Sequence, residues 1–558
     1  MTSKFLRFPT FFWALVSGLL LWAAFPPLGF WPLAWLAPVG WLLLVRRQSL
    51  LGKHPYLAIW LAGWFHWAAM LQGIRLAHPV LYWGWLSLSA YLAIYPAVFV
   101  GLTRIAVHRA HVPLLAAAPL VWTGLEWFRG HALTGFSLAL LGHTQIHWTG
   151  IIQVADLAGA YAVSFVVMFV AAALAESLDG RLSRATRRHR LMAAAVLVLV
   201  VQCYGFGRIQ ASRSIAADGK PALRVALIQG SFDTVFEADP ERDADVFSRY
   251  LELSLQAVRE APEVDLVVWP ESAFTGTLGD VVADPPWRPP PETGLSAEQF
   301  QRSVRAWEEA FQQKTDYVTR RLNEVAAKGQ TVSLIVGCDT QRLSGGRMER
   351  LNSALLIAPS GQVRARYFKE HLVMFGEYLP FGEWFPGLYD LTPMASGLTP
   401  GVGPKAFRVG SVILSPSICF ESTVPHLIRR QVVDLQRAGT PPDMLVNVTN
   451  DGWFWGSSIL DLHLACNVFR AVENRLPLVI AANTGISAHI DANGRIDQRG
   501  GRREEAILHA TVQPGAQISK YHLWGDSFSL ICILFCFAMS IIGIRDRILG
   551  GKRAKTKE

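Results

Sequence analysis

The sequence predicts a helical membrane region joined to one domain of the α/β or α+β class. The first observation is composition, because residues 9–206 and 528–544 are mostly apolar whereas residues 208–520 read like an ordinary soluble domain. The second is charge: 51% of the residues are hydrophobic and only 17% are charged, against about 25% charged in an average soluble domain. The third is an alternation of strand-like and helix-like patterns within residues 208–520.

Eight apolar segments are long enough, at about 16 to 21 residues, to approach the thickness of a bilayer. The first segment could also be a cleaved signal peptide, because Lys4 and Arg7 precede it, but the further segments favour a retained helix. We therefore predict a membrane domain of seven spans over residues 1–207, and a last span with a basic tail over residues 521–558. The predicted spans are residues 9–25, 30–45, 56–74, 80–100, 112–128, 161–178, 191–206 and 528–544.

Basic residues predict the orientation of these spans. If the amino terminus is cytoplasmic, most Lys and Arg of the short connections fall on the cytoplasmic side, and little more than Arg75 and Arg129 falls on the other. Residues 208–520 then lie outside the cytoplasm. The net charge of +9 is accounted for by this topology, so it does not indicate a nucleic-acid partner. The basic clusters are Arg46, Arg47 and Lys53; Arg181, Arg184, Arg187, Arg188 and Arg190; and Arg545, Arg547, Lys552, Arg553, Lys555 and Lys557.

One connection on the outer side, Glu126 to Gln145, combines a carboxylate, an arginine and apolar residues. Glu126 and Arg129 at a span end would ordinarily form a local ion pair. A second interpretation is that this loop helps to bind a lipid headgroup. The residues alone leave both open.

The region from 208 to 520 contains β-rich runs, several of them apolar on both faces, as expected for strands buried under helices. A Pro-rich stretch, residues 275–296, is predicted to be irregular, and a mostly helical stretch follows over 297–328. The predicted strands are residues 223–230, 265–272, 331–340, 353–359, 407–420, 443–451 and 477–491, with helices at 244–261 and 461–476.

Ionisable residues follow three of the apolar runs. Glu271 stands in "VVWPESAF", Lys369 in "YFKEHLVMFGEYLP", and Cys419 in "SICFEST". A thiol with an ordinary pKa near 8.5 needs a base or a positive charge beside it. A carboxylate can take that proton and return it to a leaving group, and an ammonium group can stabilise the oxyanion of a tetrahedral intermediate. These three residue types suffice for acyl transfer through a thioester.

The ordered motifs WPES, K-x-H-L-V-x-F-G-E-Y-x-P and C-F-E resemble the Glu-Lys-Cys triad of the nitrilase superfamily. With the predicted spans and "EWFRG…TGF", "NDGWF", "RAVENRLP" and "NTGIS", nearly the whole chain resembles the bacterial apolipoprotein N-acyltransferase family. The resemblance implies an extracytoplasmic α-β-β-α sandwich over residues 208–520. It also implies a multi-pass protein of the bacterial inner membrane.

The same resemblance implies roles for individual residues. Glu271 would be the general base, Lys369 the oxyanion stabiliser and Cys419 the nucleophile, with no cofactor or metal. Cys419 would take an acyl chain from a phospholipid and pass it to the α-amine of a lipoprotein's N-terminal diacylglyceryl-cysteine. Residues expected to support the site or bind substrate are Glu377, Glu421, Phe420 and Trp453.

The sequence departs from the family pattern at a few positions. Met374 stands where the family usually has proline, and Ala238 where a tryptophan is common, with Phe236 as a substitute contact. The Pro-rich stretch 275–296 is longer than usual and could form a lid or a partner surface. These differences bear on substrate handling more than on the triad.

Several other interpretations of the same residues stay open. A membrane-tethered amidase could use the same triad with water as acceptor. A transport or receptor protein would need polar residues inside several spans, and few are present. His371 could act as an acid or base, although a structural hydrogen bond fits its position better. Asn450, Asp451 and Trp453 either line the site or form a structural turn.

Overall fold

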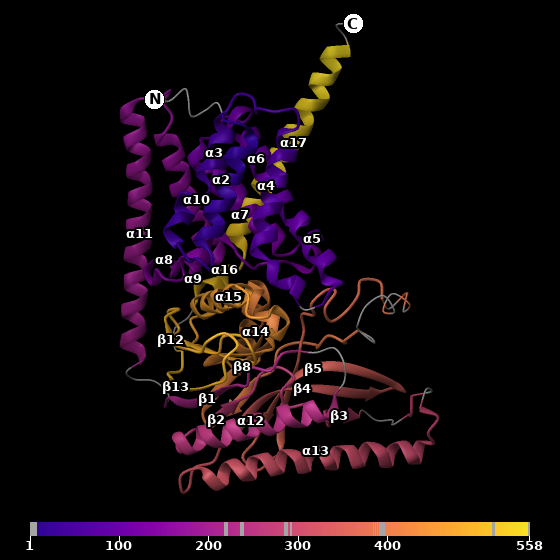
Figure 1. Ribbon diagram of the computed structural model, residues 1–558. Helices are drawn as coiled ribbons and strands as arrows, with labels where there is room; N and C mark the ends of the chain where they lie inside the picture. The colour runs from indigo at the N-terminus through magenta and orange to yellow at the C-terminus, as the bar shows by residue number, and fades with distance from the viewer. Residues whose placement is uncertain are drawn as a thin grey trace. The chain divides into compact units, whose positions relative to one another are not determined.

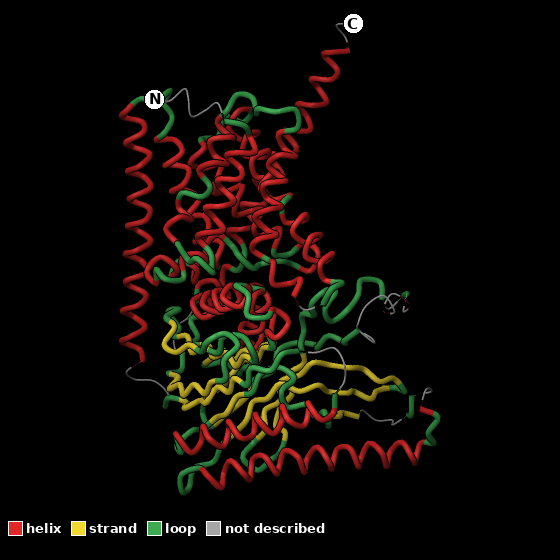
Figure 2. The backbone as a smooth tube through the Cα atoms, viewed as in Figure 1, coloured by secondary structure: helices red, strands yellow, loops and turns green. Residues whose placement is uncertain are grey.

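The computed structural model describes residues 8–76, 78–216, 221–234, 239–283, 288–290, 293–382, 384–385, 387, 389, 397–515 and 519–555. The chain divides into two compact units. Unit 1 consists of residues 1–211, 457–473 and 518–558, and unit 2 of residues 212–456 and 474–517. Unit 1 consists of helices and loops, whereas every described strand belongs to unit 2 (Figures 1 and 2).

Unit 1 is built from apolar helices joined by short loops and 3-10 turns. Its main helices are α2 (Thr10–Ala24), α3 (Val39–Arg46), α4 (Pro55–Met70), α5 (Leu81–Leu92), α6 (Ile94–His108), α7 (Leu114–Arg129), α10 (Ala160–Ser177), α11 (Arg184–Ala216), α15 (Ile459–Asn474) and α17 (Ser527–Lys555). The shorter elements are η1 (Trp31–Trp35), η2 (Gln72–Leu76), η3 (Ala132–Thr134), η4 (Leu141–Gln145), α8 (Thr149–Ile152), α9 (Ala155–Ala158) and α16 (Lys520–Trp524).

Among the described residues, four helical segments are long and apolar enough to cross a membrane, and they fall on four of the eight predicted spans. They are Leu81–His108, Ala160–Ser177, Arg184–Ser212 and Ser527–Ile548. The other four predicted spans contain α2, α3, α4 and α7, which are helical but have at most 16 residues each. At 1.5 Å per residue, such a helix rises about 24 Å, less than the roughly 30 Å of a hydrocarbon core. Those four therefore stay predictions as spans.

The connection that follows α7 is tied to its helix by two buried charged side chains. The Glu126 carboxylate accepts the backbone N–H of Leu141 at 2.7 Å, and Arg129 donates to the carbonyl oxygen of Leu138 at 3.1 Å. The Arg129 guanidinium also lies 5.0 Å from the centre of the Trp67 ring. Both charged side chains thus hold the backbone of this loop. The role of the loop in binding a lipid headgroup stays a prediction.

Unit 2 contains two sheets. The first has the order β13-β1-β2-β4-β5-β6, with β3 beside β4, and the second the order β12-β11-β10-β9-β8-β7. In the first sheet the strands are β1 (Leu223–Gln229), β2 (Leu266–Val268), β3 (Asp280–Ala283), β4 (Ser333–Ser344), β5 (Arg347–Ile357), β6 (Val363–Phe368) and β13 (Ala506–Val512). In the second they are β7 (Phe407–Val409), β8 (Val412–Ile418), β9 (Met444–Thr449), β10 (Leu478–Ala482), β11 (Ala488–Ile490) and β12 (Ile496–Arg499).

The two sheets pack face to face and are covered by helices. Apolar side chains of both sheets form one buried cluster that includes Leu227, Val268, Leu414 and Val446. Helices α12 (Pro240–Glu260) and α13 (Ala297–Val325) lie on the first sheet (Figure 1), and a second cluster joins them to it. Helix α14 (Pro425–Arg437) follows β8 and packs against it. Unit 2 therefore has the α-β-β-α layering that the family resemblance implies.

Local sequence signals account for the ends of the outer helices. Asp239 caps α12 by accepting the N–H groups of Glu241 and Arg242. Ser296 and Gln299 form a reciprocal capping box at the start of α13. The predicted helical stretch 297–328 is confirmed, since α13 occupies most of it.

Some predicted strands were wrong in extent. The run 407–420 is a hairpin, because Gly410 adopts a left-handed φ of 57° between β7 and β8. The stretch 275–296 is not irregular throughout, because β3 pairs in parallel with an extension of β4. Residues 284–287 and 291–292 of that stretch lie outside the described residues.

We expect Leu414→Ala to lower the stability of unit 2 strongly, because Leu414 is fully buried between the sheets. Truncating such a side chain costs about 2–5 kcal/mol. Thermal unfolding of the purified protein measures the loss. Arg408→Ala, at an exposed position of the neighbouring strand β7, should change stability by no more than about 0.5 kcal/mol. Equal melting temperatures for the two variants would contradict the packing described here.

Candidate active site

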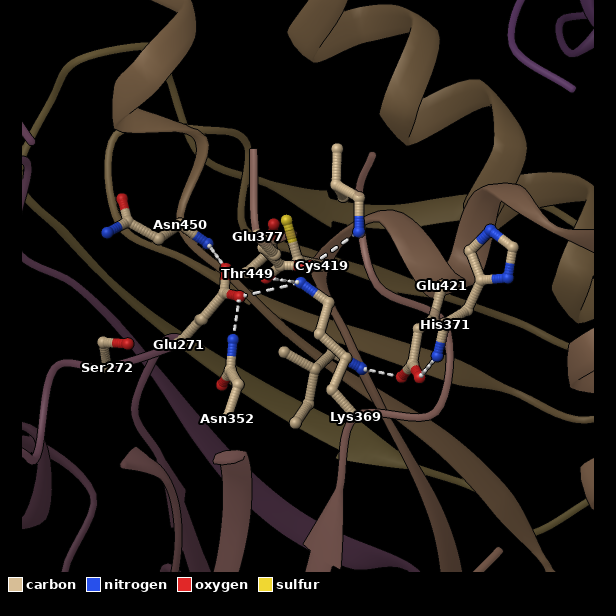
Figure 3. A network of polar contacts seen from close by, with 12 residues as sticks. Glu271, Ser272, Asn352, Lys369, His371, Glu377, Cys419, Glu421, Thr449 and Asn450 are labelled. Atoms are coloured by element: carbon tan, nitrogen blue, oxygen red, sulfur yellow. Dashed lines mark hydrogen bonds and ion pairs between the residues drawn. The ribbon is translucent and has the colours of Figure 1, made fainter. Parts of the chain in front are cut away.

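Glu271, Lys369 and Cys419 come together at one rim of unit 2 (Figure 3). Each follows the end of a strand: Glu271 comes shortly after β2, Lys369 directly after β6 and Cys419 directly after β8. The Lys369 ammonium lies 3.2 Å from the Glu271 carboxylate. Both of these charges act on the Cys419 thiol. Three residues that are far apart in the sequence therefore share one site, as their strand-end positions predict.

The carboxylate of Glu271 is held by neutral donors as well as by Lys369. Asn352, on β5, donates its side-chain amide to Oε1 at 2.6 Å, and the backbone N–H of Asn450 donates to Oε2 at 2.8 Å. The backbone there also needs Gly337, because a Cβ at that position would clash with the Glu271 Cα. Glu271 is 7% exposed, so its carboxylate is fixed in direction and largely shielded from water.

Lys369 is buried between two carboxylates. Its ammonium donates to Glu377 at 2.6 Å in addition to its contact with Glu271, and Glu377 in turn accepts the backbone N–H of Val373 at 2.8 Å. Burial lowers the pKa of Lys369, but the charges of Glu271 and Glu377 outweigh it and hold the pKa well above its ordinary value. The group is therefore a permanent cation at this site. Glu377 thus contacts the lysine directly, and its expected role in support of the site or in substrate binding stays a prediction.

Cys419 begins the 3-10 turn η7 (Cys419–Thr423) in a left-handed conformation, with a φ of 53°. Such a conformation is unfavourable for a residue with a side chain and is often retained at functional sites. The residue is partly exposed. Burial raises the pKa of the thiol well above its ordinary value, and the Glu271 charge raises it further, while Lys369 and the Thr449 hydroxyl oppose the shift. At rest the sulfur is a thiol with a base beside it.

Glu421 does not face the cysteine sulfur but joins the segments that carry the lysine and the cysteine. Its carboxylate accepts the backbone N–H groups of Glu370 at 2.6 Å, His371 at 3.0 Å and Ile418 at 2.7 Å. The Tyr367 hydroxyl donates to it at 2.9 Å. The residues before and after Lys369 are thereby bound to the end of β8. Glu421 is a support of the site's backbone.

The remaining predicted positions lie around this core. The ring of Phe420 stacks on that of His371, with centres 6.2 Å apart, and burial together with Lys369 lowers the pKa of His371. Trp453 belongs to the 3-10 turn η8 (Asp451–Phe454), which follows β9. The side chain of Asn450 caps that turn by accepting the N–H of Gly452. Asn450 therefore combines both predicted roles, because its own N–H reaches Glu271.

The departures from the family pattern have a limited structural counterpart. Met374 forms an isolated bridge with Tyr378, close to Glu377. Phe236 and Ala238 lie outside the described residues. Asn352 is the site residue that sequence reasoning missed. Its signal was a single amide shortly before the apolar residues 354–357 of β5.

The segment after Lys369 carries exposed aromatic rings. Their exposed fractions are 61% for Phe375, 65% for Phe381, 74% for Trp384 and 62% for Phe385. Large apolar side chains that are exposed together mark surfaces for apolar partners.

In the part of the chain that the structure describes, no His, Cys, Asp or Glu side chains form a group of three that could hold a metal ion.

The layered fold and its Glu, Lys and Cys residues define a protein of the carbon–nitrogen hydrolase class. Residues 224–519 match the family model described as carbon-nitrogen hydrolase. Residues 17–173 match the model for the apolipoprotein N-acyltransferase N-terminal domain. The chain belongs to the apolipoprotein N-acyltransferase family, and it is an acyltransferase.

Similar proteins cover the chain almost completely. The apolipoprotein N-acyltransferase of Geobacter metallireducens is 34% identical over 95% of this chain and 95% of that protein. That of Rhodopirellula baltica is 31% identical over 90% of this chain and 92% of that protein. Among solved structures, an amidase from Nesterenkonia sp. AN1 matches 55% of this chain and 97% of its own, with 18% identity and a TM-score of 0.34. Saccharomyces cerevisiae Nit3 matches 53% of this chain and 91% of its own, with 17% identity and a TM-score of 0.36.

The titration of Glu421 yields a test of its buried position. Burial raises the pKa of Glu421 from 4.5 to about 7, although its hydrogen bonds to Ile418 and His371 oppose this. The folded chain thus keeps a proton that the unfolded chain releases near pH 4.5. The stabilisation from this proton is complete below pH 4.5 and is lost as the pH rises through 7.

We therefore expect the stability of the parent relative to Glu421→Gln to fall by up to about 3 kcal/mol between pH 4.5 and 7. Melting temperatures measured across this range give the difference. Glu309→Gln, at an exposed position, should show no such trend. A difference between parent and Glu421→Gln that is constant with pH would show that Glu421 is ionised throughout.

Proposed function

We propose that the chain transfers an acyl chain from a phospholipid, through a thioester on Cys419, to the α-amine of the N-terminal diacylglyceryl-cysteine of lipoproteins. The observation that carries the proposal is the convergence of Glu271, Lys369 and Cys419 at one rim. Membership in the apolipoprotein N-acyltransferase family supports the lipoprotein as acceptor.

In the first half-reaction Glu271 acts as general base. Its carboxylate takes the proton of the Cys419 thiol, and the thiolate attacks the ester carbonyl of the phospholipid. Negative charge develops on the carbonyl oxygen, where the Lys369 ammonium stabilises it. The intermediate collapses to the thioester, and Glu271 returns its proton to the leaving alkoxide of the lysophospholipid. The donors from Asn352 and Asn450 keep the carboxylate aimed during both transfers.

In the second half-reaction the lipoprotein amine is the nucleophile, and the thioester is the acyl donor. The amine attacks the thioester carbonyl, Lys369 again stabilises the oxyanion, and Glu271 accepts the proton that the nitrogen loses. The intermediate expels the Cys419 thiolate and forms an amide bond. The thiolate recovers the proton from Glu271, which restores the starting state. No cofactor is required, because the donor ester is already activated.

Both substrates are lipids or lipid-anchored, and this accounts for the helical unit. Four segments are long and apolar enough to span a bilayer, and the exposed aromatic residues that follow Lys369 offer an apolar surface for acyl chains. The proposed location is the bacterial inner membrane, with eight spans and unit 2 on the periplasmic face. The distribution of Lys and Arg between the short connections supports this orientation.

A second candidate is hydrolysis of a small amide by the same three residues, with water as acceptor. The match to the carbon-nitrogen hydrolase model favours it. Hydrolysis of a small amide does not explain why the chain has apolar helices. The fate of the acyl group separates the two candidates.

Incubation with phospholipid alone should add one acyl chain to the parent protein. We expect intact-protein mass spectrometry to show this adduct, labile to hydroxylamine, in the parent and in Cys203→Ala, which removes an exposed cysteine. Cys419→Ala should show none. Free fatty acid without an adduct would favour the hydrolase. Equal donor turnover by Cys419→Ala and the parent would falsify the nucleophile assignment.

Substitution of the two carboxylates beside Lys369 should separate their roles. Glu271→Gln removes the base and should slow thioester formation by about 10²–10⁴-fold. Glu377→Gln removes only a charge-assisted hydrogen bond to Lys369 and should slow it between roughly tenfold and hundredfold. Single-turnover rates of acyl transfer to Cys419 measure both. A Glu271→Gln rate equal to that of the parent would exclude Glu271 as the base.

A further inference from the structure

A second lysine, which is partly buried, holds the backbone that follows Glu271. Lys314, on α13, donates from Nζ to the carbonyl oxygens of Phe274 at 2.6 Å, Thr275 at 2.9 Å and Leu278 at 2.8 Å. An ammonium group has three N–H donors, and all three are used on one turn. This turn, residues 274–278, begins three positions after the carboxylate of the site.

The groups around the Lys314 side chain favour its positively charged form. Its Nζ lies 4.7 Å from the ring centres of both Phe247 and Phe274, and 5.8 Å from that of Phe311. Carbonyl oxygens and the faces of aromatic rings are the groups that attract a positive charge in an apolar setting. Burial lowers the pKa of Lys314 to about 8, so the protonated form still prevails at neutral pH. An apolar side chain there would remove the Lys314 donor from all three carbonyl oxygens, of which that of Thr275 also accepts the N–H of Leu278 at 3.1 Å.

Strand β4 holds the turn as well, and the N–H of Asp339 donates to the Thr275 hydroxyl at 2.9 Å. On one side the N–H of Phe274 donates to the carbonyl oxygen of Gly337 on β4 at 2.9 Å. On the other side, Lys314 of α13 donates to the carbonyl oxygens of the turn. Between Glu271 and the turn, Ser272 has a left-handed φ of 59°, and within the turn Gly276 has one of 48°. The backbone here is thus held in an unfavourable path by contacts from β4 and from α13.

We propose that Lys314 is a positioning residue, which fixes the turn 274–278 and through it the direction of the Glu271 carboxylate. The inference rests on the proposed role of Glu271 as general base. Lys314 reaches the backbone of the turn, whereas Asn352 and Lys369 reach the carboxylate itself. If the turn relaxes, the carboxylate shifts against the thiol, and a misplacement of about 1 Å can cost about 10²-fold in rate.

The test is a double-mutant cycle in the full-length protein. Lys314→Met keeps the apolar stem and removes the three donors, and we expect it to slow acyl transfer from phospholipid to Cys419 by about 10- to 100-fold. In a Glu271→Gln background the same substitution should have little further effect, because the base that it positions is already gone. Arg302→Met removes an exposed charge from the same helix and should leave the rate unchanged.

Each outcome decides one point. Equal slowing by Lys314→Met in both backgrounds would overturn the inference, because a general loss of stability acts without Glu271. A Lys314→Met rate equal to that of Arg302→Met would overturn it as well, while leaving the proposed function intact. Full activity of Glu271→Gln would show that Glu271 is not the general base. The inference rests on that role and would be overturned as well.

A second variant, Lys314→Arg, tests the inference if Lys314→Met does not fold. Lys314→Arg keeps the charge, but its planar guanidinium cannot reproduce the three ammonium hydrogen bonds. It should be slowed less than Lys314→Met and show the same dependence on Glu271. A Lys314→Arg loss that is unchanged by Glu271→Gln would again overturn the inference.

Discussion

The site depends on one buried ammonium group between two carboxylates. A charge such as that of Lys369 can leave water only if partners compensate for the lost hydration, and removing one partner of a buried pair costs about 3–5 kcal/mol. Glu271 and Glu377 supply that compensation at 3.2 and 2.6 Å. The end of β2, the end of β6 and the segment after β6 are therefore held together by electrostatics at the point where the sheet's own hydrogen bonds stop.

The second sheet joins this cluster through backbone groups. Glu421 accepts N–H groups on both sides of the gap between Lys369 and Cys419, and Asn450 donates its own N–H to Glu271. Cys419 and Glu271 follow strands of different sheets, so these bridges determine the distance between them. Apolar packing between the sheets sets the layers about 10 Å apart, and the polar bridges refine their alignment at the rim.

Much of this site could be predicted from the sequence, because an ionisable residue directly after an apolar run is a local and visible signal. Glu271, Lys369 and Cys419 all had it. Asn352 did not, since a single amide in a strand gains meaning only from the neighbour that the sheet register gives it. Lys314 was hidden in the same way, in the amphipathic pattern of α13. The α/β or α+β class followed from periodicity, and the α-β-β-α order of the layers from the family resemblance. Strand β3 and the four shorter apolar helices depended on pairing and on helix breaks that composition does not resolve.

The protonated state of Cys419 has a consequence for the durability of the enzyme. Oxidants attack the thiolate, and a cysteine passes to sulfenic acid and beyond in proportion to its thiolate character and exposure. Burial and the charge of Glu271 raise the pKa of this thiol, so the resting sulfur offers peroxides little to react with. In the proposed mechanism the thiolate forms only when Glu271 takes this proton as an acyl donor arrives. An arrangement that delays activation thereby also protects the cysteine against oxidative inactivation between turnovers.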